Sequence, residues 1–272
     1  MIRPLWTYIG IAYGITWTVL LGFYYLYVQG SISHDELNLY YNIGALGPFL
    51  ASIITTYLFY NKAGLKKLFA TFNPSRLERK STLLALTPLF FFAIGWLLYP
   101  VFTGHWFSFD ITRQQFNLNT PLAYWGWITP FITYALLEEP GWRGFVLPHL
   151  QEKYSAFTAT FFLTVIWALW HAPMFLARFD FSPVIAVGFF FGIFMGAIVL
   201  TTIFNLSRGS MLAAILFHLT NNFASAFEKE YIVAVISTVF IFLAIYLLIH
   251  FKKENLADKD RVKNYFLSHT GD

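Results

Sequence analysis

The sequence contains no cysteine, and charged residues make up only 12% of its 272 positions. Without thiols the chain has no cysteine nucleophile, no thiolate ligand for zinc or iron–sulfur clusters, and no disulfide framework. Globular chains carry about 25% charged residues. By contrast, 57% of this chain is hydrophobic and 21% is aromatic. These proportions exclude an ordinary soluble domain and predict an integral membrane protein.

The excess of basic over acidic residues is small, with a formal net charge of +4. In a membrane protein such an excess normally sets the orientation of the chain in the bilayer. We therefore predict no nucleic-acid partner. The sequence also lacks an internal repeat of the kind that many transporters contain.

Eight apolar segments have about the 20 residues that a helix needs to cross the hydrocarbon core. They span residues 4–29, 42–60, 82–102, 121–137, 155–177, 183–205, 209–227 and 231–250. The fourth would reach toward Leu150 if its helix continued past Pro140. The sequence therefore predicts an all-α, polytopic membrane protein of about eight transmembrane helices, forming one domain over residues 1–250. Gly188, Gly192 and Gly196 recur at every fourth position, which predicts a smooth helix face for close packing.

Lysine and arginine remain on the cytoplasmic side of membrane proteins. They gather between the second and third segments and again in the tail, residues 251–272, namely Lys62, Lys66, Lys67, Arg76, Arg79, Lys80, Lys252, Lys253, Lys259, Arg261 and Lys263. No such excess of basic residues occurs in four other loops, which contain Glu36, Asp110, Arg178 with Asp180, and Glu228. We therefore predict that both termini are cytoplasmic and that the tail is a solvated, charged end.

Two carboxylates and an arginine follow the fourth apolar segment. A charged side chain at bilayer depth costs at least about 2.5–3.5 kcal/mol, so one that is kept there suggests a function. Glu139 and Arg143 are four residues apart, in the favourable order for an ion pair on one helix face. Glu138 points about 100° away from Glu139, which leaves its carboxylate available for proton transfer. The alternative is that these charges cap a helix end in water.

Three further polar side chains lie inside apolar segments. His171 follows Trp167 by four residues, and Asn222 follows His218 by four, so that His218 and Asn222 share a helix face. Each histidine by itself could simply join two helices by a hydrogen bond. Together with Glu138, however, these residues suggest one polar cavity.

Hydrolysis is the chemistry that suits this set. A carboxylate and an imidazole can deprotonate a water, and a second imidazole and a carboxamide can stabilise an oxyanion. No serine or threonine has a convincing base partner in the sequence. A zinc or other divalent site formed by Glu138, His171 and His218 is the alternative, although the usual His-Glu-x-x-His spacing is missing.

The ordered set of motifs resembles a known family. Glu138-Glu139-x-x-x-Arg143, Trp167-x-x-x-His171 and His218-x-x-x-Asn222, on successive hydrophobic helices, are similar to the motifs of the CPBP family. These proteins are also called Abi or CAAX-processing intramembrane proteases, and this chain looks like a relative of the Ras-converting endopeptidase. Trp167 stands where the family usually has phenylalanine.

The resemblance implies an intramembrane endopeptidase of the glutamic type, formerly classed as a metalloprotease, that needs no cofactor. Glu138 and His171 would activate water, His218 and Asn222 would form the oxyanion hole, and Glu139 with Arg143 would be the supporting pair. The substrate would be a lipidated or membrane-associated peptide or protein, and the location the plasma membrane of a bacterium. A transporter, or a non-catalytic immunity-type protein that uses the same polar cavity, is the remaining alternative.

Overall fold

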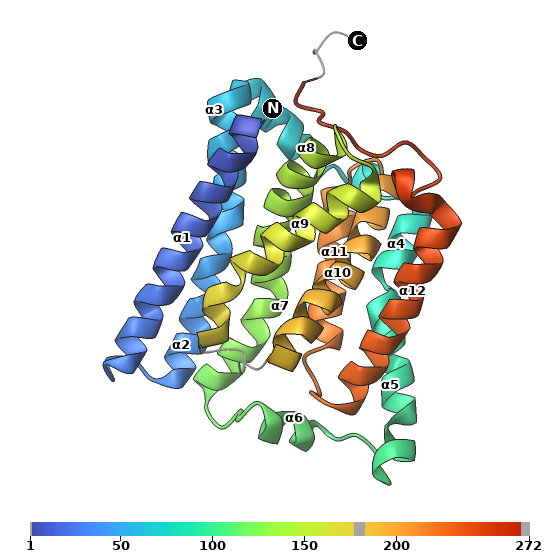
Figure 1. The fold of residues 1–272 in the computed structure, drawn as a ribbon. Coiled ribbons are helices and arrows are strands. Elements are labelled where there is room, and N and C mark those ends of the chain that lie inside the picture. Colours follow the sequence, from blue (N-terminus) through green and yellow to red (C-terminus); the bar gives the residue numbers. More distant parts are fainter. Residues whose placement is uncertain (1, 177–182, 268–272) are drawn as a thin grey trace.

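The computed structural model describes residues 2–176 and 183–267, and over these residues it is entirely helical, without a strand (Figure 1). The first half contains α1 (Ile2–Val28), α2 (His34–Tyr40), the short helix η1 (Tyr41–Ala45), α3 (Leu46–Ala70), η2 (Pro74–Arg76), α4 (Arg79–Ala85), α5 (Thr87–Thr103) and α6 (Phe109–Gln115). The second half contains α7 (Pro121–Gly141), η3 (Trp142–Val146), α8 (Leu147–Gln151), α9 (Ala156–Trp170), η4 (Ala172–Leu176), α10 (Pro183–Leu206), α11 (Met211–Ala224) and α12 (Tyr231–Asn255). The prediction of an all-α membrane protein is confirmed. The expected loop with Arg178 and Asp180 lies outside the described residues.

Five helical segments of the described chain are long and apolar enough to cross a membrane. They are Arg3–Val28, His34–Ala70, Arg79–Thr103, Val187–Leu206 and Tyr231–Asn255. The helices α9 and α11 are apolar but have 15 and 14 residues. At 1.5 Å per residue they are roughly 22 Å long, which is less than the hydrocarbon thickness. Each expected apolar segment therefore coincides with a helix, but the number of eight membrane crossings is not confirmed.

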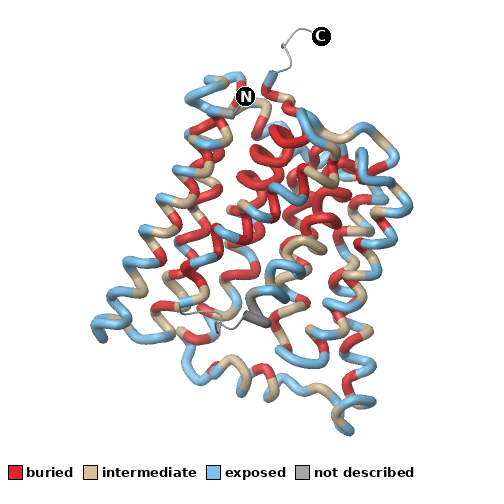
Figure 2. Tube along the Cα trace, viewed as in Figure 1, coloured by how far each residue is buried: buried red, intermediate tan, exposed pale blue. Residues whose placement is uncertain are grey.

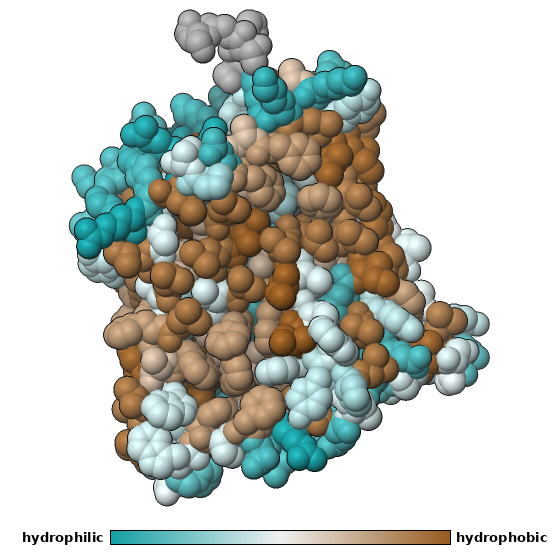
Figure 3. All heavy atoms as spheres, turned by 180° about the vertical axis from the view of Figure 1, so that it is seen from behind, coloured by the Kyte–Doolittle hydropathy of each residue, from teal (hydrophilic) through white to brown (hydrophobic). Residues whose placement is uncertain are grey.

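The surface agrees with a membrane location. Seen from behind, hydrophobic residues gather over the middle of the molecule and hydrophilic residues toward its two ends (Figure 3). Large apolar side chains such as Trp6, Leu97, Val101 and Ile249 are exposed. In water an exposed apolar surface of this extent would be a liability, whereas lipid tails solvate it without cost.

The helix that begins at Pro121 continues without interruption to Gln151, as the sequence suggested for an extension past Pro140. Directly after Pro140 and Gly141 the backbone widens into a turn of π-helix, Trp142–Val146, before α8 resumes the α-helical spacing. Proline removes one intrahelical hydrogen bond, and the wider turn accommodates this loss without breaking the helix. Residues 138–151 are buried without exception, and Figure 2 shows this segment in the interior of the bundle.

Two glycines allow neighbouring helices to approach the π-helical turn closely. A Cβ atom on Gly141 would lie 2.1 Å from the Tyr8 hydroxyl and 2.8 Å from the Pro48 carbonyl oxygen. A Cβ on Gly144 would lie 2.9 Å from the Met211 methyl group. The helices α1, α3 and α11 are thereby pressed against this segment.

The smooth helix face predicted at Gly188, Gly192 and Gly196 differs from Gly141 and Gly144 in its contacts. A Cβ on any of Gly188, Gly192 or Gly196 would meet no heavy atom of the described residues within 4 Å. The prediction of close helix packing at these three positions is therefore wrong for this structure. Glycine spacing shows where a helix face is smooth, but it does not show that a neighbouring helix lies there.

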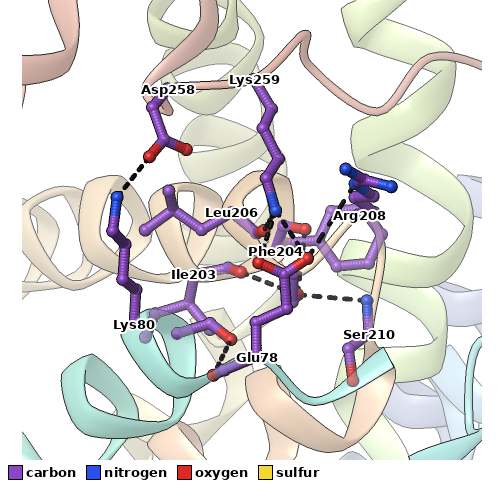
Figure 4. A network of polar contacts seen from close by, with 11 residues as sticks. Glu78, Lys80, Ile203, Phe204, Leu206, Arg208, Ser210, Asp258 and Lys259 are labelled. Atoms are coloured by element: carbon purple, nitrogen blue, oxygen red, sulfur yellow. Dashed lines mark hydrogen bonds and ion pairs between the residues drawn. The ribbon is translucent and has the colours of Figure 1, made fainter. Parts of the chain in front are cut away.

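The tail after α12 packs against the bundle, so the prediction of a solvated end is wrong for residues 256–267. The Phe266 side chain is buried and stacks on Tyr60, with 4.9 Å between ring centroids. The Tyr265 hydroxyl donates a hydrogen bond to the carbonyl oxygen of Gly144 in the π-helical turn. At the surface, Lys80 donates to Asp258 over 2.6 Å and lowers the pKa of that carboxyl group (Figure 4).

Candidate active site

The two adjacent glutamates at the end of α7 face different partners. Glu138 and Glu139 have 1% and 0% of their surface exposed, and Arg143 has 0%. These charges are therefore not a helix cap in water. Because the residues are adjacent, their side chains point in different directions around the helix axis. The sequence-based expectation that Glu138 does not share Arg143 agrees with the hydrogen bonds described next.

Two indole N–H groups donate to the same oxygen of Glu138. Trp142 Nε1 lies 3.1 Å and Trp167 Nε1 lies 2.5 Å from Glu138 Oε2. Trp142 is on the next turn of the same helix, whereas Trp167 comes from α9. Glu138 Oε1 has no hydrogen bond to any described residue. The carboxylate is thus fixed through one oxygen, and the other is available to a water molecule.

Glu139 is the centre of an ion-pair network. Its Oε1 accepts a hydrogen bond from Arg143 Nη1 over 3.1 Å and another from His218 Nδ1 over 2.7 Å. The Arg143 guanidinium also lies over the Trp167 ring, 4.3 Å from the ring centroid. Glu139 therefore connects α7 to α11 and fixes the orientation of the His218 ring.

The contacts of His171 determine which of its ring nitrogens carries the proton. His171 Nδ1 lies 2.8 Å from the Trp167 carbonyl oxygen. A carbonyl oxygen can only accept, so Nδ1 donates and the lone pair of the neutral imidazole is on Nε2. The imidazole is therefore a base at Nε2. His171 and His218 are both 8% exposed, and Asn222 is partly buried.

Trp167 brings the predicted residues together. Its ring centroid is 5.9 Å from that of His171 and 6.0 Å from that of His218, and its N–H binds Glu138. Glu138, Glu139, Arg143, His171 and His218 are thus joined by direct contacts with one another or with Trp167. Asn222 lies one turn after His218 on α11, on the same helix face, and its side chain makes no hydrogen bond with the described residues.

Buried polar atoms without a partner are concentrated at this site. In the described part of the chain eight buried side-chain atoms have no hydrogen-bond partner, and five of them lie here: Tyr8 Oη, Glu139 Oε2, Arg143 Nε, Arg143 Nη2 and Trp170 Nε1. The ring of Trp170 contacts those of Trp142 and His171. Unsatisfied buried polar groups are rare in proteins and need a specific explanation. A binding site for water and polar substrate atoms gives that explanation.

The alternative, a metal site formed by Glu138, His171 and His218, can be compared with the positions of these side chains. In residues 2–176 and 183–267 no three His, Asp or Glu side chains gather in an arrangement that could hold a metal ion. The Nδ1 atom of His218 is directed at Glu139, and the Nδ1 atom of His171 at a backbone carbonyl. Glu138, His171 and His218 thus lie near one another without forming a ligand set.

Residues 120–224 match the family model of the Rce1-like type II CAAX prenyl endopeptidases. This range includes every residue that the sequence motifs singled out. A second comparison gives 34% identity over 95 residues to a protein named CAAX prenyl protease 2 from Methanococcus maripaludis. That match covers 32% of this chain and 35% of the length of the Methanococcus protein. The resemblance to the CAAX-processing family is confirmed over the segment that contains the site.

Trp142 and Trp167 were not recognised from the sequence as hydrogen-bond donors to Glu138. Trp142 follows Glu138 by four residues, a spacing at which a helix brings side chains together, so this contact had a local signal. Trp167 was noted only as a departure from the phenylalanine of the family. Its N–H is a hydrogen-bond donor that phenylalanine lacks, and only the packing of α9 against α7 shows that the donor reaches Glu138.

We expect Trp167→Phe to lower kcat of a reaction that uses Glu138 as a base about tenfold while KM changes little, because one hydrogen bond to a carboxylate is lost and an aromatic ring is kept. Steady-state kinetics with the purified protein in detergent measures both constants. Trp127→Phe is the matched control, because the Trp127 indole donates to the Ala226 carbonyl away from the site. Equal activity of the two variants would show that the indole hydrogen bond does not position Glu138.

Proposed function

We propose that the protein is an intramembrane endopeptidase of the glutamic type, which hydrolyses a peptide bond in a lipidated or membrane-associated substrate. The observation that carries the proposal is the placement of Glu138 and His171 around Trp167, with Glu138 Oε1 and His171 Nε2 as the basic atoms. The match to CAAX prenyl endopeptidases over residues 120–224 supports the same activity.

The first chemical step is the activation of water. A water molecule between Glu138 Oε1 and His171 Nε2 transfers a proton to this pair as its oxygen attacks the peptide carbonyl carbon. The indole N–H groups of Trp142 and Trp167 keep the carboxylate of Glu138 in place during this transfer. The same pair then returns the proton to the amine that leaves, so the pair ends each cycle in its starting state.

The second requirement is stabilisation of the oxyanion that forms on the attacked carbonyl. In the proposed mechanism His218 donates from both ring nitrogens, from Nδ1 to Glu139 and from Nε2 to the oxyanion, and Asn222 supplies an amide donor one turn away. Glu139 orients the His218 ring through its hydrogen bond with Nδ1. Arg143 pairs with Glu139 and holds it by a second hydrogen bond.

We also propose an orientation with both termini in the cytoplasm. The start of α1 and the end of α12 lie at the same end of the bundle (Figure 1). The basic residues of the α3–α4 connection and of the tail meet at this end, where Lys259 pairs with Glu78 over 2.6 Å. The positive-inside rule assigns this end to the cytoplasm. Location in the plasma membrane of a bacterium stays a prediction.

The proposed function is tested by incubating the purified protein in detergent with a library of prenylated and other membrane-anchored peptides, with and without a chelator. We expect cleavage that survives chelation, because the proposed mechanism uses protein groups alone. His171→Ala should abolish the cleavage, and His105→Ala, which changes an exposed loop histidine, should leave it unchanged.

Each contrary result has a specific meaning. Cleavage that a chelator removes and zinc restores would make Glu138, His171 and His218 metal ligands and would overturn the metal-free mechanism. No cleavage of any peptide by the unmodified protein would contradict the protease assignment. Proton or cation flux in liposomes that depends on the same residues would then identify a transporter.

A further inference from the structure

A second polar site lies away from the candidate active site, at the end of the bundle where α3 and α10 end. Six residues line a pocket there: Lys67 and Ala70 near the end of α3, Arg76 in η2, Arg208 after α10, and Val262 and Tyr265 in the tail. The pocket therefore joins four segments that are far apart in the sequence. Of these six described residues, three are cationic at neutral pH and none is acidic.

Among the described residues, carboxylates do not fully balance the positive charges of Arg76 and Arg208. Arg76 Nη1 donates to the Arg208 carbonyl oxygen over 3.3 Å, and Lys67 Nζ donates to the Phe266 carbonyl oxygen over 3.4 Å. The bond of Arg76 to a backbone carbonyl holds its side chain without cancelling its charge. The described carboxylate that pairs with a pocket cation is Glu78, whose Oε1 is 3.9 Å from Arg208 Nε.

Glu78 is already engaged by another cation. The ammonium group of Lys259 bonds both of its carboxylate oxygens, so Glu78 has no full negative charge left for Arg208 (Figure 4). The figure shows Glu78 between Lys259 and Arg208. Among the described residues, Arg76 and Arg208 therefore give this pocket a surplus of positive charge. An anion with several acceptor oxygens is the complementary ligand, because arginine binds such groups through two parallel N–H donors.

The position of the pocket favours a ligand from the membrane. Lys67 and Ala70 are at the end of one candidate span, His34–Ala70, and Arg208 follows the end of another, Val187–Leu206. The ends of spans lie at the depth of the lipid head groups. Phe69 and Leu77, which are neighbours of pocket residues in the sequence, are exposed and apolar. Basic pockets between membrane helices at the cytoplasmic face are suited to anionic head groups.

We propose that the pocket formed by Lys67, Arg76, Arg208 and Tyr265 binds a phosphate group, supplied by the head group of an anionic lipid or by a free phosphate compound. The tail contributes Tyr265 and Val262 to one wall, so the anion would also fix the tail on the bundle. The proposal is independent of the peptidase mechanism, because none of these residues belongs to the candidate active site.

The test is native mass spectrometry of the full-length protein in detergent, titrated with phosphatidylglycerol or with phosphatidylcholine of the same acyl chains. We expect the first phosphatidylglycerol to bind about tenfold more tightly than phosphatidylcholine. The double variant Arg76→Gln/Arg208→Gln should lose this preference. The matched control Lys66→Gln/Arg79→Gln, which removes two exposed positive charges outside the pocket, should retain it.

A second arm distinguishes the two sources of the phosphate. The thermal unfolding midpoint of each variant is measured in inorganic phosphate and in chloride at equal ionic strength. A phosphate-specific rise in the unmodified protein that the pocket variant lacks identifies free phosphate as a ligand, whereas a response to phosphatidylglycerol alone identifies the lipid. The proposal is overturned if the pocket and control variants bind phosphatidylglycerol equally and respond equally to phosphate.

A folding defect is separated from a binding defect by the same measurements. The midpoint of the pocket variant without lipid or phosphate should be close to that of the control variant, since neither pair of substitutions touches the buried core. If the pocket variant were unfolded, Arg208→Gln alone would serve as the second variant. It removes one pocket charge and should weaken phosphatidylglycerol binding severalfold.

Discussion

Glu138→Gln is expected to lower kcat/KM for peptide cleavage by roughly 10²–10⁴-fold, which is the range typical of general-base removal. Glutamine has nearly the same shape as glutamate, and its amide oxygen can still accept hydrogen bonds from Trp142 and Trp167. It cannot accept a proton from water near neutral pH. The loss would therefore affect the chemical step, with the architecture of the site preserved.

The measurement is steady-state hydrolysis of a peptide identified by the library experiment, together with the thermal unfolding midpoint of each variant. Glu230→Gln is the control, because Glu230 is an exposed glutamate in the connection before α12. We expect normal activity from this control. Activity of Glu138→Gln within tenfold of the unmodified protein would contradict the assignment of Glu138 as the base.

The second large effect is expected on the free energy of unfolding. It comes from the buried ion pair of Glu139 and Arg143. Arg143→Met should lower the free energy of unfolding by about 3–5 kcal/mol, as is typical when one partner of a buried ion pair is removed. The reason is that Glu139 would remain buried with its charge and with His218 as its only described hydrogen-bond partner. The contact of the guanidinium with the Trp167 ring would be lost as well.

This prediction is measured by unfolding in mixed micelles with increasing denaturing detergent. Lys80→Met is the matched control, because it removes a cation from the exposed ion pair with Asp258, and exposed pairs contribute little. The double variant Glu139→Gln/Arg143→Met should recover part of the lost stability, since no buried charge is then left without a partner. A single variant as stable as the Lys80 control would show that the pair is not structurally important.

Some features of the site follow directly from the spacing of residues along a helix. Glu139 and Arg143 are paired because a helix brings residues four apart onto one face, and this contact needs no tertiary information. The same geometry explains why Glu138 faces other partners. The placement of these charges inside the bundle was open in the sequence, because a capping role at a water-exposed helix end fitted the pattern equally well. The continuation of the helix to Gln151 settles their burial.

Other features depend on which helices are neighbours. The hydrogen bond from Trp167 to Glu138 joins α9 to α7, and the bond from His218 to Glu139 joins α11 to α7. No local pattern specifies these distances. The tail illustrates the same limit, because its many charges are typical of a solvated end, while Phe266 and Tyr265 anchor it on Tyr60 and on the π-helical turn.

The sequence by itself determined the class of the fold, the approximate positions of the helices and the identity of charged residues that the structure buries. Hydrophobic runs and fixed helical spacings are local properties, and the bilayer converts them into structure. The tertiary structure alone decided which donors bind each carboxylate, where glycines allow close packing, and how the tail packs against the helix bundle. These features arise from contacts between segments distant in the sequence, whose geometry is set by packing rather than by local pattern.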